Sequence, residues 1–212
     1  MSHVRRNWVM AGSTLAIFIV VAIFVVSAAS GGANKSNGIS FQMVRSAGAA
    51  AIGCLPNAAA DVTVKSQGPV EVMNVKVEGL PAKTEFDFFV IQVPNSPFGL
   101  SWYQGDIETT ASGRGHGRFI GRFNTETFIV GPGSAPAPVV HNGPFPDASL
   151  NPAMNPVHTF HLGLWFNDPA DAVEAGCAGS VTPFNGDHNA GTQALSTRNF
   201  IDDQGPLRML TP

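Results

Sequence analysis

The feature that most constrains this chain is a series of short apolar runs between residues 70 and 130, separated by turn residues. In residues 70–77, valines nearly alternate with polar side chains, with one slip of phase at Met73. Near-alternation of β-branched residues is typical of a strand that buries one face. Further apolar runs of strand length follow at residues 86–93, 119–123 and 127–130. Short strands with turn signals between them predict a mostly β protein, an antiparallel β-sandwich or barrel.

Glycine and proline mark the expected turns between these strands. Residues 79–81 (Gly-Leu-Pro) turn the chain, residues 95–99 break it, and the glycine-rich residues 113–117 are expected to form a flexible turn. The chain has 23 glycines and 16 prolines, and only 13% of its residues are charged. This composition favours a turn-rich β protein over a helical bundle.

The N-terminal segment is expected to direct the rest of the chain out of the cytoplasm. Residues 8–29 contain no charge and follow Arg5 and Arg6. About 20 apolar residues suffice for a transmembrane helix, and basic residues stay on its cytoplasmic side. The alternative is a cleaved signal peptide, because residues 27–29 (Ser-Ala-Ala) offer a cleavage site. We therefore expect residues 1–29 to be a signal-anchor helix in the membrane or a signal peptide, and the protein to be membrane-anchored or secreted.

The remainder divides into a linker and one domain. Residues 30–40 are small and polar, which is typical of a flexible linker. Residues 41–212 suit a single extracytoplasmic domain. The net charge of −3 gives no basic surface for nucleic acid, which we exclude as a partner. Residues 168–176 are expected to form one short helix, with Asp168 as N-cap.

Two cysteines, Cys54 and Cys177, lie far apart in the sequence. An even cysteine count in an exported protein predicts a disulfide. A reactive or metal-binding thiol is the alternative.

The turn before the second apolar run has a recognisable motif. Residues 79–86 read Gly-Leu-Pro-Ala-Lys-Thr-Glu-Phe, which resembles the Gly-Leu-x-Pro-x-Thr-x-Tyr run of fibronectin type III and other immunoglobulin-like domains. Two departures are that Pro81 directly follows Leu80 and that Phe86 replaces the tyrosine. The resemblance implies an immunoglobulin-like sandwich. More broadly, the exported part resembles a family of uncharacterised secreted or membrane-anchored proteins from Gram-positive soil bacteria, which implies a location and no activity.

Four histidines are candidates for a metal site: His141, His158, His161 and His188. A histidine-rich strand, a later Gly-Cys and the Asn-Gly-Asp-His of residues 185–188 resemble features of copper/zinc superoxide dismutases. That resemblance implies a copper- or zinc-binding metalloprotein as the alternative function. The spacing differs, however, because His158 and His161 are three residues apart, which points them to opposite faces of a regular strand. Core-packed, hydrogen-bonded histidines are the competing interpretation.

A second group of candidate ligand-binding residues lies just after the break at residues 95–99. Trp102 and Tyr103 are followed by Asp106, which combines flat aromatic surfaces with a hydrogen-bonding carboxylate. Sugar-binding faces need this combination. The full set of candidate ligand contacts is Trp102, Tyr103, Asp106, His158, His161 and His188. A surface glycan or a surface protein is the expected partner.

Signals for catalysis are weaker. Asp106 and Glu108 are two residues apart and could share a strand face, as the acids of a glycosidase do. The chain has no Gly-x-Ser-x-Gly motif and no phosphate-binding loop. We therefore expect an extracytoplasmic binding or structural surface module rather than an enzyme, and the sequence implies no cofactor.

Overall fold

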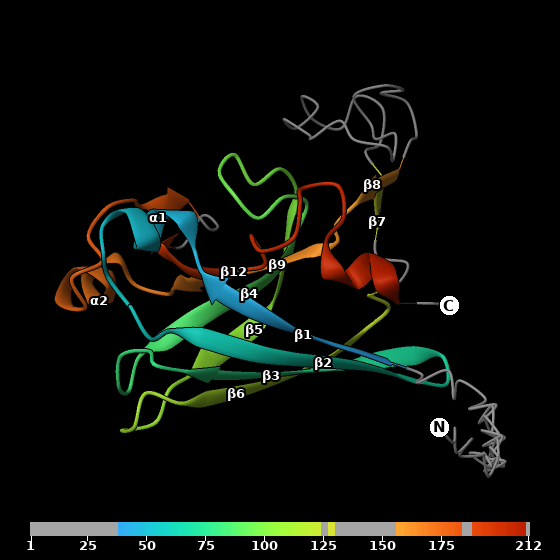
Figure 1. Cartoon of the computed structure of the whole chain (residues 1–212), viewed down its shortest axis with the longest axis horizontal. Coiled ribbons are helices and arrows are strands. Elements are labelled where there is room, and N and C mark those ends of the chain that lie inside the picture. The colour runs from blue at the N-terminus through green and yellow to red at the C-terminus, as the bar shows by residue number, and fades with distance from the viewer. Residues whose placement is uncertain (1–37, 124–126, 130–155, 184–187, 211–212) are drawn as a thin grey trace, which may run out of the picture. The chain divides into compact units, whose positions relative to one another are not determined.

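One antiparallel sheet of eight strands dominates the computed structural model, which describes residues 38–123, 127–129, 156–183 and 188–210 (Figure 1). The expectation of a mostly β chain is confirmed. Its strands are β1 (Gly38–Arg45), β2 (Ala59–Gln67), β3 (Val70–Glu78), β4 (Glu85–Ile91), β5 (Ser101–Glu108), β6 (Gly115–Gly121), β9 (His161–Phe166) and β12 (Gln193–Ser196). Two short pairs are separate, β7 (Thr127–Ile129) with β8 (Pro156–His158) and β10 (Thr182–Pro183) with β11 (Asn189–Ala190).

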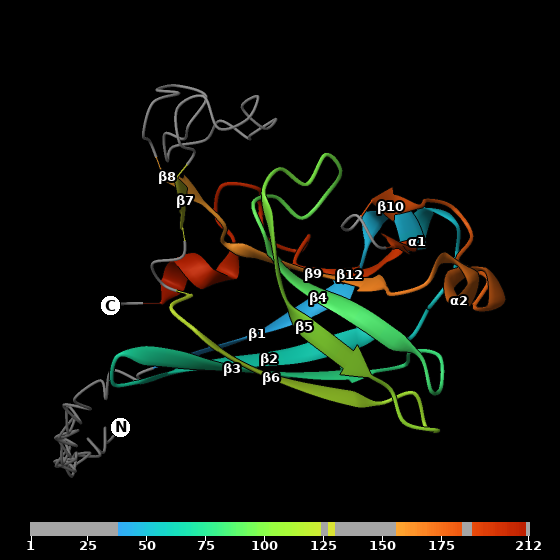
Figure 2. The ribbon, with the colours of Figure 1, turned by 180° about the vertical axis from the view of Figure 1, so that it is seen from behind.

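The strand order is β5-β4-β9-β12-β1-β2-β3-β6, which makes two groups of four. The groups are joined through two residue pairs between β1 and β12, where Val44 faces Ser196 and Arg45 faces Leu195. Figures 1 and 2 show β4 and β5 crossing β1, β2 and β3 obliquely. The two end strands, β5 and β6, also meet, because Thr109 forms an isolated bridge with Gly115. The sheet is therefore strongly curved, with the main core between its halves.

Aromatic side chains from distant strands fill this core. Phe88 on β4 stacks on Phe119 on β6, with ring centroids 4.8 Å apart. Gly117 makes room for this ring, because a Cβ there would lie 2.6 Å from Phe119. Gly117 and Gly115 thus belong to β6 and not to the flexible turn expected at residues 113–117, which was wrong in its position. The turn that the chain makes lies earlier, at residues 110–114.

The phase slip at Met73 has a simple structural explanation. β3 pairs with β2 in unbroken register from Val70 to Glu78. Met73, Val75 and Val77 face the main core, and Val72 lies on the opposite face, where it is still buried. The slip therefore marks apolar residues on both faces of one regular strand.

Two short helices flank the sheet, and a disulfide joins the segments that follow them. α1 (Ala47–Ala51) is capped by Ser46 and has no counterpart among the elements expected from the sequence. α2 (Pro169–Glu174) is capped by Asp168, whose carboxylate accepts from the Ala170 N–H, as expected. The predicted disulfide between Cys54 and Cys177 is confirmed, with Cα atoms 5.4 Å apart. A 3₁₀ helix, η1 (Pro206–Met209), follows β12.

The histidine-rich segment, the linker and the N-terminal segment were also predicted from the sequence. The histidine-rich strand, which we expected to run over residues 157–166, is instead two strands, because the chain divides into β8 and β9 at Thr159 and Phe160. β1 begins at Gly38, inside the segment expected to be linker. The predicted N-terminal helix lies outside the described residues. Among the helices of the described part, none is long and apolar enough to cross a membrane.

Candidate functional site

The candidate site lies on the side of β4, β5 and β9 that faces away from the main core. Four side chains form a line across neighbouring strands there, because Asp106 pairs with Asp87, Asp87 with Trp165, and Trp165 with Gln193. We call these four residues the Asp87 row. Neighbouring strands are about 4.8 Å apart, so each side chain of the row can reach the next. The row places two carboxylates beside an indole and an amide.

Three members of the Asp87 row are buried and lack hydrogen-bond partners. Asp87 is 1% exposed, Trp165 3% and Gln193 6%. Neither carboxylate oxygen of Asp87, nor the Trp165 Nε1, nor the Gln193 Nε2 has a partner. A buried polar atom without a partner costs free energy, and such atoms are rare in folded proteins. The row therefore holds two acceptor atoms and two donor groups whose hydrogen-bonding capacity is not used.

Asp106 interacts with Tyr103 and with the acidic side chains of Asp87 and Glu85. The Tyr103 hydroxyl donates a hydrogen bond to the Asp106 carboxylate. Burial, and to a smaller extent the negative charge of Asp106, raises the pKa of Asp87 to about 6. Two ionised carboxylates cannot hydrogen-bond to each other, so a bond between Asp87 and Asp106 forms only when one of them holds a proton. Burial, and then the charge of Asp106, also raises the pKa of Glu85.

Aromatic rings line one side of the row. Phe89 contacts both Tyr103 and Trp165, at centroid distances of 5.5 and 5.3 Å. Phe98, from the loop between β4 and β5, contacts Trp165 edge-to-face at 4.9 Å. The indole folds over Gly163, where a Cβ would lie 2.2 Å from its ring. These contacts hold the Trp165 ring in one position beside Asp87.

His188 approaches the row from the segment that leads into β11. Its Nε2 lies 3.9 Å from the Asp87 Oδ2, which is beyond hydrogen-bond distance, and its side chain is 38% exposed. Of the residues expected to bind a ligand, the structure thus brings together Tyr103, Asp106 and His188. They come from β5 and from a segment more than 80 positions later in the sequence.

The other expected residues lie elsewhere. Trp102 pairs with Val90, on the opposite side of β5 from Tyr103, so the two rings do not form one surface. His161 is fully buried, and its two ring nitrogens contact the Thr197 hydroxyl and the Asp202 carbonyl, both at 2.9 Å. Burial lowers the pKa of His161. His158 stacks on Phe160. His161 is therefore the core-packed, hydrogen-bonded histidine of the competing interpretation, whereas His158 is only half-buried.

The described histidines do not converge on a metal. His161 pairs with Ile91, which is four residues from Asp87 along β4. At about 3.3 Å per residue, His161 lies roughly 13 Å from Asp87, the residue that His188 approaches. Within the described ranges, no group of three or more His, Cys, Asp or Glu side chains could hold a metal ion. His141 lies outside these ranges.

Sequence reasoning missed Asp87, Trp165 and Gln193. A signal for Asp87 was present, because one acid interrupts the apolar β4 sequence Glu-Phe-Asp-Phe-Phe-Val-Ile. A charge at such a position is expected to have a partner or a function. The partners of Asp87 come from β5 and β9, and the local sequence does not reveal this pairing.

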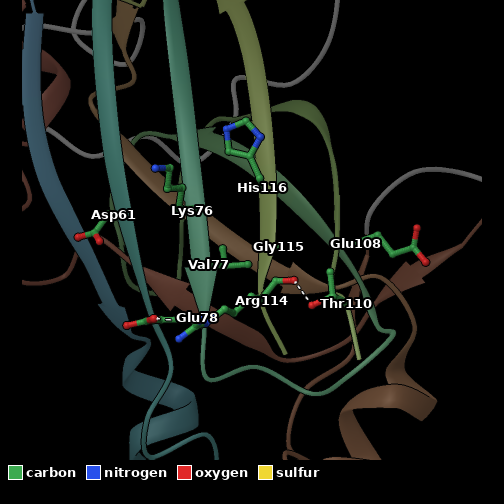
Figure 3. A pocket seen from close by; sticks show the side chains of 9 residues that line it. All are labelled: Asp61, Lys76, Val77, Glu78, Glu108, Thr110, Arg114, Gly115 and His116. Carbon is green, nitrogen blue, oxygen red and sulfur yellow. Dashed lines mark hydrogen bonds and ion pairs between the residues drawn. The ribbon is translucent and has the colours of Figure 1, made fainter. Parts of the chain in front are cut away.

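An open groove lies on the outer side of β2, β3 and β6, away from the Asp87 row. It has a volume of about 620 Å³ and is lined by Asp61, Lys76, Val77, Glu78, Glu108, Thr110, Arg114, Gly115 and His116 (Figure 3). Asp61, Lys76 and His116 form a line across three strands, since Lys76 pairs with both of the others. None of the lining side chains is among the buried polar groups without partners.

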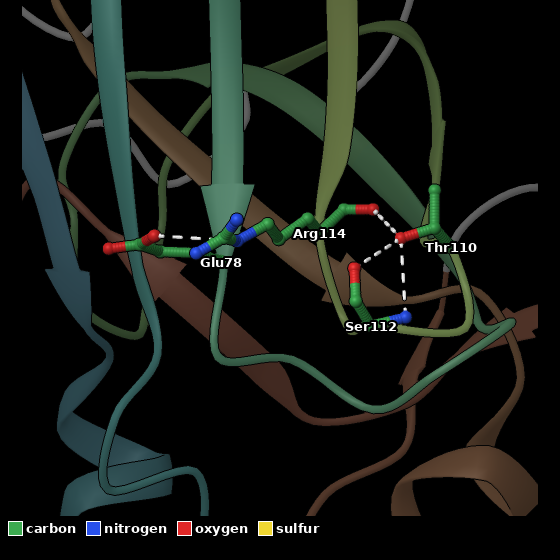
Figure 4. Close-up of polar contacts among 4 residues, drawn as sticks. All are labelled: Glu78, Thr110, Ser112 and Arg114. Atoms are coloured by element: carbon green, nitrogen blue, oxygen red, sulfur yellow. Dashed lines mark hydrogen bonds and ion pairs between the residues drawn. The ribbon is translucent and has the colours of Figure 1, made fainter.

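The lower end of this groove is a solvated turn. The Arg114 Nε lies 3.9 Å from Glu78, and both side chains are largely exposed (Figure 4). An exposed pair of this kind contributes about 0–1 kcal/mol. The Thr110 hydroxyl donates to the Arg114 carbonyl at 3.0 Å and contacts the Ser112 hydroxyl, which closes the turn between β5 and β6. The groove's charges are thus accounted for by neighbours and water, and the Asp87 row is the stronger candidate.

Comparison with protein-family models and with curated protein sequences finds no match. The function must therefore be argued from the site.

Proposed function

We propose that this chain is an extracytoplasmic binding module that holds a surface glycan through the Asp87 row and the aromatic rings beside it. The observation that carries the proposal is the set of buried polar atoms without partners on Asp87, Trp165 and Gln193. A sugar hydroxyl both donates and accepts hydrogen bonds, so it can satisfy the carboxylate and the N–H groups alike.

The surroundings of the row support a glycan over an apolar ligand. Tyr103 is 38% exposed and its hydroxyl is bonded to Asp106. A half-exposed ring beside carboxylates provides a stacking surface for a sugar ring together with acceptors for its hydroxyls.

An extracytoplasmic location is part of the proposal. The disulfide between Cys54 and Cys177 supports it, because such bonds form and persist in oxidising compartments. The apolar N-terminal segment would serve as membrane anchor or cleaved signal.

The immunoglobulin-like sandwich is also part of the proposal. The turn at residues 79–84 leads from β3, in one group of four strands, into β4, in the other. Leu80 is buried beneath this turn, and Phe86 is fully buried in β4. Phe86 can fill the core position of the motif's tyrosine, without its hydroxyl.

The proposal is tested with a glycan array probed with the labelled full-length protein, followed by equilibrium binding of the strongest glycan. We expect Tyr103→Phe and Asp106→Asn each to weaken binding about tenfold, because each removes a charged or hydroxyl contact worth about 1.4 kcal/mol. Asp61→Asn is the matched control, since Asp61 is an exposed strand carboxylate on β2, outside the Asp87 row.

The control should bind like the wild type. Binding to no glycan, or equal weakening by all three substitutions, would overturn the proposal.

A further inference from the structure

We propose that residues 202–210, which we call the strap, are fastened to β9 by the neutral ring of His161, and that protonation of this ring releases the strap. This device is independent of the proposed glycan site. The strap follows β12, the last strand of the eight-stranded sheet in the sequence, and contributes no strand itself. Its release therefore breaks no strand pair of the sheet.

The strap covers part of the main core. Leu207 and Leu210 are buried members of that core. The Leu207 N–H donates to the Phe160 carbonyl oxygen at 3.2 Å. Gly205 lies against the same carbonyl, since a Cβ at this glycine would be 2.2 Å from the oxygen. Departure of the strap would therefore uncover apolar core side chains beside the start of β9.

His161 joins the strap to the sheet through both of its ring nitrogens. The Nε2 lies 2.9 Å from the Asp202 carbonyl oxygen, and the Nδ1 lies 2.9 Å from the Thr197 hydroxyl. A carbonyl oxygen only accepts, so the Nε2 carries the proton of the neutral ring and the Nδ1 accepts from the hydroxyl. The Thr197 oxygen in turn accepts from the Leu162 N–H at 3.1 Å. The neutral ring therefore satisfies every polar group of this network.

A second proton on the ring breaks this arrangement. The Nδ1 would then donate, so the Thr197 hydroxyl would have to turn its own hydrogen away from the ring. Thr197 is fully buried, and within the described residues its hydroxyl has no other acceptor. His161 is also fully buried, and a buried charge costs free energy. Departure of the strap would relieve both costs, because water could then reach the charged ring.

Burial and Asp202 act on the ring in opposite directions. Burial is the larger effect and lowers the pKa of His161, whereas the carbonyl and the charge of Asp202 raise it. β12 carries no titratable side chain, and neither do residues 89–91, the part of β4 beside His161. The other titratable or charged side chains of the adjoining segments, which are not among the main causes of this shift, are His158, Arg198, Asp203 and Arg208.

The direction of the pH effect follows from proton binding. A hydrated histidine has a pKa of about 6.5, and the pKa of His161 beneath the closed strap is lower. The closed state therefore binds fewer protons than the released state. It is favoured most above about pH 7 and becomes less stable as the pH falls below about 6.5. We expect the equilibrium constant for release to rise about tenfold or more between pH 7.5 and pH 5.

Hydrogen exchange of the full-length protein at pH 7.5 and pH 5, corrected for the intrinsic exchange rate, measures this release. We expect the protection of the strap amides to fall about tenfold or more at pH 5, and to be lower there than the protection of the β2 and β3 amides. Equal protection of the strap and these strands at pH 5 would show that the strap opens only when the whole protein unfolds. That result would overturn the inference.

Substitutions then identify the sensor. His161→Gln keeps an N–H donor and an oxygen acceptor but has no titratable ring, so its strap protection should be nearly the same at both pH values. His158→Gln is the matched control, because His158 is a half-buried histidine three residues earlier. This control should keep the pH dependence of the wild type. A pH dependence that survives His161→Gln, or that His158→Gln removes, would overturn the assignment to His161.

A measurement on the unsubstituted protein decides the matter even if His161→Gln does not fold. Nuclear magnetic resonance of the histidine rings reports the tautomer and the protonation of His161 at each pH. We expect the Nε2–H tautomer at pH 7.5, and protonation over the same pH range in which the strap loses its protection. A charged His161 ring beneath a protected strap, or an Nδ1–H tautomer at pH 7.5, would overturn the inference.

Discussion

At the scale of single residues, the Asp87 carboxyl combines burial with a shortage of partners. Its pKa is raised to about 6 in the folded protein, mainly by burial, whereas an unfolded aspartate has a pKa of about 3.9. The folded state therefore binds this proton more tightly than the unfolded state does. The free energy of unfolding falls as the pH rises from about 4 to about 6, and the full cost of the Asp87 charge is present above about pH 6. Ligand or ordered water would offset that cost.

We expect Asp87→Asn to stabilise the protein by about 1–3 kcal/mol at pH 7.5, and this gain to vanish below about pH 4, where both proteins are neutral at this position. Urea unfolding of wild type and variant at several pH values measures the difference. His161, whose pKa burial lowers, is present in both proteins and cancels. A variant less stable than the wild type at pH 7.5 would show that the Asp87 charge has partners in the folded state.

Gly163 is the second residue whose substitution should change the stability of the protein. A Cβ at this position would lie 2.2 Å from the Trp165 ring and 2.9 Å from the Gln193 amide. Because Phe89 and Phe98 hold the ring, it cannot move aside freely. Gly163→Ala should cost about 1–3 kcal/mol by overpacking and shift the tryptophan fluorescence. Thermal unfolding checks the stability, with Gly179→Ala as control, since its Cβ would meet its nearest neighbour at 3.7 Å.

The sequence predicted half of this site. Tyr103, Asp106 and His188 were identified because aromatic, acidic and imidazole side chains are chemically conspicuous. Trp165 and Gln193 were missed because their role depends on strands that pair across long sequence distances. Trp102 was paired with Tyr103 by proximity in sequence, yet strand geometry puts neighbouring residues on opposite faces.

At the scale of elements, local signals were reliable where one residue sets the conformation. Asp168 caps α2, and Gly176 after it has a φ of +71°. These features need no tertiary information. Gly115 and Gly117 were read as a turn for the same local reason, but tertiary packing decided otherwise, because the core needs space for Phe119. α1 is short and depends on Ser46 and on its packing beside β12, which no sequence period reveals.

The disulfide connects the segments that follow these two helices and gives a prediction at the scale of elements. It closes a sequence separation of 123 residues. The chain-entropy relation gives about 4–5 kcal/mol for a loop of this length. We expect the double substitution Cys54→Ala/Cys177→Ala to lower the unfolding free energy by about that amount. Denaturant unfolding measures it, and a change below about 1 kcal/mol would contradict a stabilising role.

At the scale of the whole molecule, the strand order has a consequence for how the protein is made. β12 lies between β9 and β1, so it completes the connection between the two groups of four strands. The sheet cannot close until residues 193–196 have been synthesised. Non-local pairing of this kind slows folding. The last strand in the sequence of this sheet therefore sets the moment at which its two halves can be joined.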